Sequence, residues 1–318
     1  MRRMLIACAT LVLSLTAMAD DDYQRARPSE HLPYLTARLQ QGQLAALDTF
    51  LDSLPSAQSE PLRWWLLQGL SGSERPAAPT RTWVAAQSKR VPSTLTSQTQ
   101  DGFLVSLPRY DYPALARRLL QSWQQLDWQG QYGYELAAGK LNLRAIYRWN
   151  NPDLERQQSA LLAALAQAPN PVRLQLAQAV ARTPLYLPDN RLIYTLLDYT
   201  GSSELFFTLW RRPVDDDSLR ALALVSRFHE GNAAGELLLS AAAEPGLNSA
   251  AMLALGALHP LPDPVRSYLH RELGIGPDGV ALAKLLKPRA ESLQLILLAD
   301  RLLHEQGGGR VYPEPGRP

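Results

Sequence analysis

The chain has 318 residues, of which 46% are hydrophobic and 19% charged, and its formal net charge at pH 7 is +2. A chain of this length can bury a large apolar core. So small a net charge gives no electrostatic basis for binding nucleic acid or an anionic membrane surface. The single cysteine, Cys8, excludes an intramolecular disulfide.

The first 19 residues have the three parts of a bacterial secretory signal peptide. Arg2 and Arg3 form a basic start, Met4 to Leu15 an apolar run, and Ala17-Met18-Ala19 a small-residue cleavage site. The apolar run is too short to span a bilayer core, which needs roughly 20 residues. We therefore expect cleavage after Ala19 and a periplasmic or secreted protein without a stable transmembrane anchor.

One alternative lies inside this segment, because Leu5-Ile6-Ala7-Cys8 resembles the lipobox of bacterial lipoproteins. In a lipobox the apolar run precedes the cysteine, whereas here most of it follows Cys8, so we favour the cleaved signal. Loss of Arg2 and Arg3 lowers the basic residues from 32 to 30, which equals the 30 acidic residues. The mature chain would contain no thiol nucleophile and no thiolate metal site.

Three short helices are expected between residues 29 and 72, in an N-terminal helical region of residues 20–72. Leucines recur every three or four residues through 29–42, 43–55 and 59–72. This spacing places them on one face of each helix.

Residues 73–108 are rich in Ser, Thr and Pro and lack a helical period, so we expect a linker. Within it, STLTSQT (93–99) and FLVSL (103–107) flank Gln100-Asp101-Gly102, a pattern typical of a tight turn between two strands. A small β-hairpin is therefore expected near residues 91–107.

A helical period returns over residues 109–305, and a Gly- and Pro-rich tail, expected to be disordered, follows at 306–318. Three segments combine a polar start with Ala or Leu at three- and four-residue spacing: 170–184, 217–231 and 248–262. Second helical segments follow them at 189–200, 233–244 and 263–274, and an additional helix fits at 203–212. The pattern predicts antiparallel helix pairs that bury their apolar stripes against neighbouring pairs.

Three stretches resemble HEAT and armadillo-like repeat proteins. NPVRLQLAQAVA (170–181) and LPDPVRSYL (261–269) resemble their helix starts, and SAAMLALGAL (249–258) resembles their Ala-rich helix. The resemblance covers roughly residues 150–300 and implies a mainly α fold, an α-solenoid of antiparallel helix pairs. The N-terminal helices look like TPR-type pairs. Repeat lengths vary, and the Pro-Val-Arg of the 263–274 segment opens a second helix instead of a first.

The spacing also predicts which side chains are buried in this region. We expect a core made by Leu176, Val180, Leu222, Val225, Leu253 and Leu255. Small residues are expected where helices touch, at Ala177, Ala223 and Ala254.

No motif indicates catalysis, and we expect no catalytic residue, metal site or cofactor. Asp215-Asp216-Asp217 lacks the alternating ligands and the glycine of a calcium loop, and fits a helix N-cap and first turn. No two histidines lie three or four residues apart. GLSGS (69–73) lacks the last glycine of a nucleophile elbow. Catalytic carboxylates far apart in the sequence remain an open alternative.

Aromatic residues are concentrated between 110 and 149, which hold eight of the 19 Trp and Tyr residues. In DWQGQYGYE (127–135) they alternate with Gly and Gln, as in a loop that stacks on sugars or holds a peptide. Trp128, Tyr132 and Tyr134 are the candidate contacts. We favour the other interpretation, in which these aromatics fill the junction between the N-terminal helices and the repeats.

The leading hypothesis is an exported, non-enzymatic scaffold or adaptor that binds a protein or peptide in the cell envelope. Its predicted contacts are the Tyr, Trp and Arg side chains of the second helices and the added helix: Arg191, Tyr194, Tyr199, Trp210, Arg211, Arg212, Arg266, Tyr268 and Arg271. Alternatively, Arg211 and Arg212 cap a helix and pair with Asp215 to Asp217. The alternative function is a cell-wall or glycan-related factor, an enzyme or an enzyme-assisting protein, that uses residues 127–149.

Overall fold

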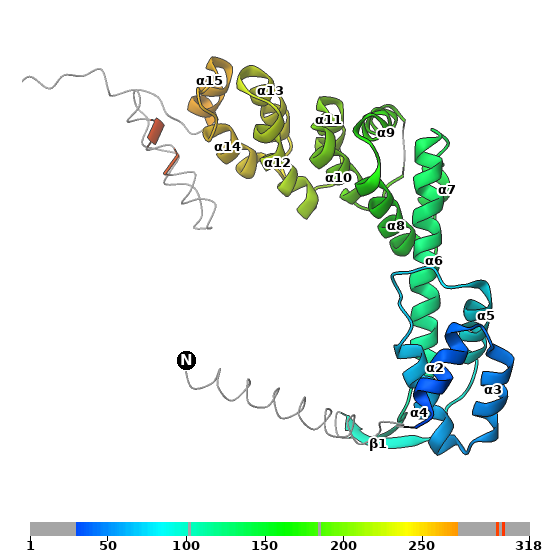
Figure 1. Ribbon diagram of the computed structural model, residues 1–318. Helices are drawn as coiled ribbons and strands as arrows, with labels where there is room; N and C mark the ends of the chain where they lie inside the picture. The colour runs from blue at the N-terminus through cyan, green and yellow to red at the C-terminus, as the bar shows by residue number, and fades with distance from the viewer. Residues whose placement is uncertain (1–29, 101–102, 184–185, 273–296, 299–300, 303–318) are drawn as a thin grey trace, which may run out of the picture. The chain divides into compact units, whose positions relative to one another are not determined.

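A computed structural model describes residues 30–100, 103–183, 186–272, 297–298 and 301–302. The expected signal peptide with Cys8 and the expected C-terminal tail lie outside these residues. The described residues form fourteen helices and one two-stranded antiparallel hairpin, so the protein is mainly α (Figure 1). The chain divides into two compact units, Met1–Trp128 and Gln129–Pro318. None of the described helices combines the length and hydropathy needed to cross a membrane.

The three expected N-terminal helices are confirmed as α2 (Leu32–Gln40), α3 (Leu44–Ser53) and α4 (Ser56–Gln68). Leu32, Leu44, Leu54 and Leu70 pack partly buried against the core of the first unit, and the fully buried leucines of the three helices are Leu35, Leu39, Leu47, Leu51, Leu62, Leu66 and Leu67. Helix α4 begins one turn earlier than its sequence pattern predicts, so Pro61 lies inside it.

The expectation that residues 73–108 contain no helix is wrong, because they include α5 (Ala78–Gln87). Pro79 occupies the first turn, where a missing backbone N–H costs no helical hydrogen bond. Trp83, Val84 and Gln87 are buried, and this spacing of one, three and four residues is the helical signal. The Pro- and Thr-rich composition obscured it.

The β-hairpin is confirmed, with β1 (Leu95–Gln100) and β2 (Phe103–Pro108) paired from Leu95 opposite Pro108 to Gln100 opposite Phe103. Helix α6 (Tyr112–Ala137) follows it, beginning in the first unit and ending in the second. The loop expected at 127–135 is therefore helical. A glycine in a helix costs about 1 kcal/mol relative to alanine, but Tyr132 and Leu136, four residues apart, are both buried on one side of α6.

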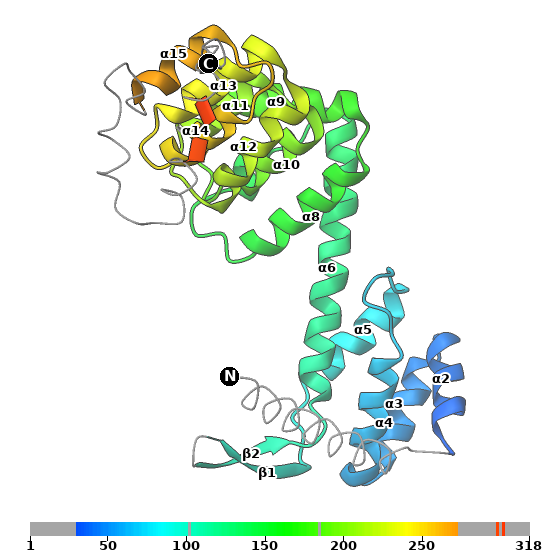
Figure 2. The same ribbon diagram turned by 90° about the vertical axis from the view of Figure 1, so that its left-hand side faces the viewer.

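The second unit contains a short helix, α7 (Leu143–Ile146), and then two layers of helices (Figures 1 and 2). In one layer α8 contacts α10, α10 contacts α12 and α12 contacts α14. In the other, α9 contacts α11, α11 contacts α13 and α13 contacts α15. Their bounds in chain order are α8 Leu154–Gln167, α9 Asn170–Arg182, α10 Arg191–Thr200, α11 Ser203–Trp210, α12 Asp216–Phe228, α13 Gly231–Ala242, α14 Asn248–Gly256 and α15 Asp263–Glu272.

This alternation changes the expected repeat register. The helix treated as an addition, α11, is a regular member of the layer that contains α9 and α13. Helix α9, expected as a first helix, shares that layer with the expected second helices α13 and α15. Helix α10, expected as a second helix, lies in the layer of α12 and α14. The longer interval between α9 and α12 therefore contains two ordinary helices.

Most of the predicted core of the second unit is buried. Val180, Leu222, Val225 and Leu255 are buried, and so is Ala177. The remaining predicted leucines, Leu176 and Leu253, are half-buried, as is Ala254. Ala223 is exposed, which contradicts its assignment to a helix contact. It lies between the buried pairs Ala221–Leu222 and Leu224–Val225, on the opposite side of α12.

Candidate binding surfaces

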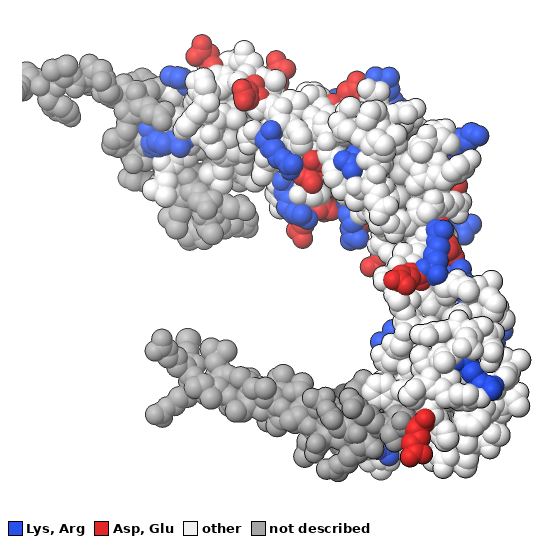
Figure 3. Space-filling view, in the orientation of Figure 1, with Lys and Arg blue, Asp and Glu red and all other residues white. Residues whose placement is uncertain are grey.

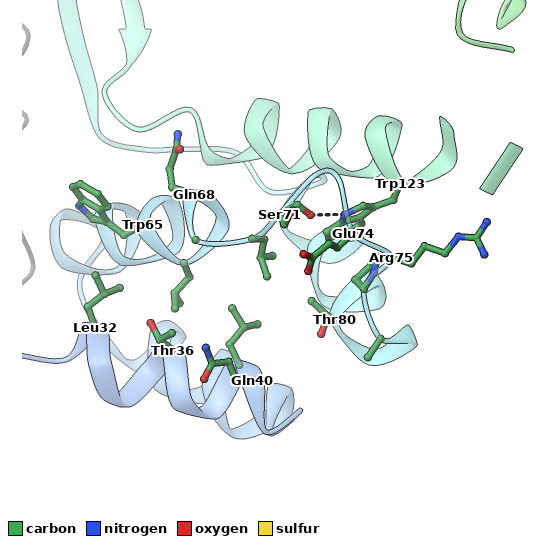
Figure 4. Close-up of a pocket in the computed structure, with 16 residues that line it drawn as sticks. Leu32, Thr36, Gln40, Trp65, Gln68, Ser71, Glu74, Arg75, Thr80 and Trp123 are labelled. Atoms are coloured by element: carbon green, nitrogen blue, oxygen red, sulfur yellow. Dashed lines mark hydrogen bonds between the residues drawn. The ribbon is translucent and has the colours of Figure 1, made fainter. Parts of the chain in front are cut away.

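An open groove of about 620 Å³ lies in the first unit (Figure 4). It lies among α2, the end of α4, the connection that follows α4, the start of α5 and one residue of α6. Its lining residues are Leu32, Thr36, Leu39, Gln40, Trp65, Leu66, Gln68, Gly69, Leu70, Ser71, Glu74, Arg75, Pro76, Ala77, Thr80 and Trp123.

The groove has a fixed apolar floor. Leu39, Leu66 and Trp123 line it and are at most 5% exposed, because they also belong to the core of the unit. The indole Nε1 of Trp123 donates to the backbone oxygen of Ser71 at 2.9 Å, which holds the connection after α4 against α6 (Figure 4). Thr36 and Gln40 on α2 add neutral hydrogen-bonding groups at the rim.

Two charged residues line the groove, and only one of them faces it. The Glu74 carboxylate points toward the cavity, whereas the Arg75 side chain extends away from it (Figure 4). Arg75 forms an ion pair with Asp127 at 3.6 Å and donates to the backbone oxygen of Leu126 at 2.9 Å. The charge presented to a ligand is therefore negative.

Sequence reasoning missed this groove. The GLSGS segment was considered as a nucleophile pattern, and its first three residues, Gly69, Leu70 and Ser71, instead line the groove. Leu32 and Trp123 are far apart in the sequence, and no periodic pattern indicates that α2 and α6 contribute to one cavity. The one sequence feature that could have indicated the groove is a cluster of Trp and Leu in α4, followed by a Gly- and Ser-rich connection.

The predicted partner-binding residues of the second unit do not lie together on one surface. Arg191, Tyr194 and Tyr199 belong to α10, in the layer of α8, α12 and α14. Arg266, Tyr268 and Arg271 belong to α15, in the other layer. The two sets therefore lie in different layers.

The α10 residues instead take part in a surface of paired charges and rings. Arg220 of α12 lies 4.4 Å from the Tyr194 ring centroid and donates to its hydroxyl at 3.3 Å. Arg173 of α9 lies 4.0 Å from the Tyr199 ring centroid. Figure 3 shows basic and acidic side chains intermixed on one face of this unit. These contacts fix the tyrosines but also cover part of each ring.

Trp210 and Arg212 make contacts within the second unit. Trp210 is 1% exposed and stacks on Phe206 at 5.7 Å, so it is not a surface anchor. Arg212 donates to the Asn190 side-chain oxygen at 2.6 Å and to the backbone oxygen of Leu187 at 2.8 Å. Arg211 is exposed.

The acidic run 215–217 has the predicted N-terminal position. Asp215 caps α12, and its side chain accepts a hydrogen bond from the backbone N–H of Ser218 at 2.9 Å. Asp216 and Asp217 lie in the first turn. The hydrogen bonds of Arg212 go to the segment before α10 instead of to these carboxylates.

The aromatic candidates of residues 127–149 differ in exposure. Tyr132 is 5% exposed, and burial together with the charge of Glu135 raises its pKa to about 12. Trp128 is half-buried, and Tyr134 is 74% exposed. Trp149 is also 74% exposed and contacts the exposed ring of Tyr186, with a centroid distance of 5.7 Å. The exposed aromatic pair is therefore Trp149 with Tyr186.

Among the described residues, no group of three or more His, Cys, Asp or Glu side chains is arranged to hold a metal ion. No protein-family model, curated protein or solved structure matches the chain.

Proposed function

We propose that this protein is a non-enzymatic helical scaffold or adaptor that binds a peptide segment of a partner protein in the cell envelope. The observation that carries the proposal is the groove of the first unit, which combines a fixed apolar floor, neutral hydrogen-bonding groups and one inward carboxylate. Ligand pockets are commonly lined by apolar side chains, with a few polar groups that fix the orientation of the ligand. Glu74 favours a segment with a basic residue beside its apolar side chains.

The second unit supports the scaffold part of the proposal. Its helices alternate between two layers, and most contacts join neighbours in the chain, as in an α-solenoid of the HEAT type. The envelope location rests on the secretory pattern of residues 1–19.

Site-specific photocrosslinking in the native host tests the groove. A photoreactive residue at Gln40, on the exposed rim, should yield an adduct with a partner, and Thr36→Trp should abolish the adduct by filling the groove. The same photoreactive residue at Gln178, an exposed position of α9 that does not line the groove, is the control. Equal adducts from both positions, or an adduct that persists with Thr36→Trp, would contradict the proposal.

A second candidate function, glycan binding, is favoured by the exposed Trp149–Tyr186 pair, since adjacent aromatic rings can stack on sugars. Retention on isolated cell-wall glycan should be lost with Trp149→Ala plus Tyr186→Ala and kept with Tyr134→Ala, which removes another exposed ring. Identical retention of both variants and the wild type would eliminate this candidate.

A further inference from the structure

The β-hairpin carries four of the exposed large hydrophobic side chains described in the first unit. Phe103 is 74% exposed, Leu104 75%, Leu95 57% and Leu107 38%. Side chains alternate between the two faces of a strand. Phe103, Val105 and Leu107 therefore share one face, and Leu104 lies on the other. Neither face is covered by the rest of the described unit.

The hairpin is fixed at its base and is not a free linker. Glu60 of α4, only 4% exposed, accepts hydrogen bonds from the backbone N–H of Ser93 at 2.6 Å and of Thr94 at 3.1 Å. The backbone N–H of Arg109 donates to the oxygen of Thr94 at 2.9 Å, which closes the base. Both ends of the hairpin are therefore tied together, and one is tied to the helical core.

Both strands also leave an edge open. Within the part of the chain that the structure describes, the sheet has two strands, so each pairs on one side only. Exposed edges are commonly protected by Lys, by Pro, by inward charges or by bulges. The proline of β2, Pro108, is only its last residue. Neither β1 nor β2 contains a charged residue, and they pair in continuous register. The side chains of β2, FLVSLP, are mostly apolar, whereas those of β1, LTSQTQ, are mostly polar.

We propose that β2 pairs in antiparallel orientation with β2 of a second copy of this chain and forms a four-stranded sheet. Symmetric pairing brings two copies of one segment side by side, so a charge in it would lie near the same charge of the partner, which is destabilising. β2 is free of that penalty. Residues opposite each other in an antiparallel pair share a face. With Val105 opposite Val105 of the second copy, the Phe103, Val105 and Leu107 face of one copy continues into that of its partner. This interface is independent of the peptide groove.

Sedimentation analysis of the full chain, over a range of concentrations, tests the interface. The wild type should associate reversibly from the mass of one chain to twice that mass. Leu104→Lys should weaken association about tenfold or more, because it brings two cations to diagonal positions on one face of the new ladder. Since Leu104 is 75% exposed, the substitution leaves the core intact. The matched control is Ser97→Lys, an exposed position on β1, which should associate like the wild type.

A charge-swap experiment separates pairing between β2 strands from loss of folding. Leu104→Glu alone should also weaken association, whereas a mixture of Leu104→Lys and Leu104→Glu chains should restore it as a heterodimer. A wild type that remains monomeric at all concentrations would overturn the proposal. So would a dimer that is unaffected by Leu104→Lys, equally weakened by Ser97→Lys, or not restored in the mixture.

Discussion

The first unit buries two charged side chains, Arg63 and Glu60, whereas the buried polar side chains described in the second unit are all neutral: Gln158, Asn190 and Ser218. Arg63 is 2% exposed and donates to Asp48 at 2.8 Å, Asp52 at 2.6 Å and Gln87 at 2.6 Å. These partners belong to α3 and α5, while Arg63 itself belongs to α4. One guanidinium therefore joins three helices.

In the second unit, Asn190 has the corresponding role without a buried charge. Its Nδ2 donates to the backbone oxygen of Pro213 at 2.9 Å and to the hydroxyl of Ser218 at 2.8 Å. These bonds join the starts of α10 and α12, which are neighbours in one layer. The difference shows two ways to specify helix packing. The first unit uses one charged hub, and the second repeats apolar contacts between successive helices.

The largest expected effect comes from removing the hub. Arg63→Ala leaves Asp48, Asp52 and Gln87 without their shared donor, and breaking a buried ion pair costs about 3 to 5 kcal/mol. Arg90 also pairs with both aspartates, at 3.1 and 2.8 Å, so we expect the lower end of that range. Hydrogen exchange of α3, α4 and α5 should show the loss of protection in this unit.

The matched control is Arg227→Ala in the second unit. Arg227 is 60% exposed and pairs with Asp198 at 2.6 Å. An exposed pair of this kind contributes about 1 kcal/mol or less. Similar losses for Arg63→Ala and Arg227→Ala would mean that the charged hub does not organise the first unit.

The same contrast explains which features the sequence revealed. Helices α2 to α4 and the hairpin follow from leucine spacing and from the Gln100-Asp101-Gly102 turn, which are local signals. The hub joins Asp48, Arg63 and Gln87 across three helices, and no period relates such positions. The groove escaped prediction for the same reason, because α2, α4, α5 and α6 all contribute to it.

In the second unit the sequence pattern identified the helices but not the order in which they repeat. Ala- and Leu-rich segments identified helices, yet periodicity does not state which layer a helix joins. Trp210 illustrates the consequence, since a Trp beside two arginines has the composition of a surface anchor. It is instead buried against Phe206, and Arg212 turns back to Asn190. Only the Arg212 contact joins two layers, because Phe206 and Trp210 both belong to α11.

A smaller loss of stability is expected when the glycines that end helices in the two units are replaced. Gly201 ends α10 with a φ of +59°, and an added Cβ there would lie 2.4 Å from Cγ of Phe228. Gly42 follows α2 with a φ of +72° and has open space around the same position. A left-handed backbone costs an alanine about 1 to 2 kcal/mol. We expect that loss for Gly42→Ala and a larger one for Gly201→Ala.

Thermal unfolding, together with hydrogen exchange in the affected unit, measures the loss of stability in both glycine variants. Gly201→Ala combined with Phe228→Ala should recover the part of the loss that comes from the clash, after allowance for the cost of Phe228→Ala alone. Equal losses for Gly42→Ala and Gly201→Ala would show that Phe228 moves aside freely. In that case the packing between α10 and α12 is looser than the contact predicts.

The smallest expected effect is the response to acid. Burial opposes ionisation of Asp48 and Glu60, but hydrogen bonds outweigh it, from Arg63 to Asp48 and from Ser93 and Thr94 to Glu60, so both pKa values are lowered. In the second unit, burial and the charge of Asp215 raise the pKa of Asp217, whereas hydrogen bonds from Ser218 and Asn190 outweigh burial and lower that of Asp215. The two shifts in the second unit therefore oppose each other.

A carboxyl whose pKa is lower in the folded state stabilises the fold above its unfolded pKa of about 4, and that contribution is lost as the pH falls through the folded value. The hairpin and α3 should therefore lose exchange protection before α10 and α12 when the pH falls below about 4. Exchange rates corrected for intrinsic pH dependence measure this order. Glu60→Gln cannot ionise, so it should remove the acid response of the hairpin base while leaving that of α3. Earlier opening of α10 and α12, or an unchanged hairpin response in Glu60→Gln, would show that these hydrogen bonds do not set the acid sensitivity of the first unit.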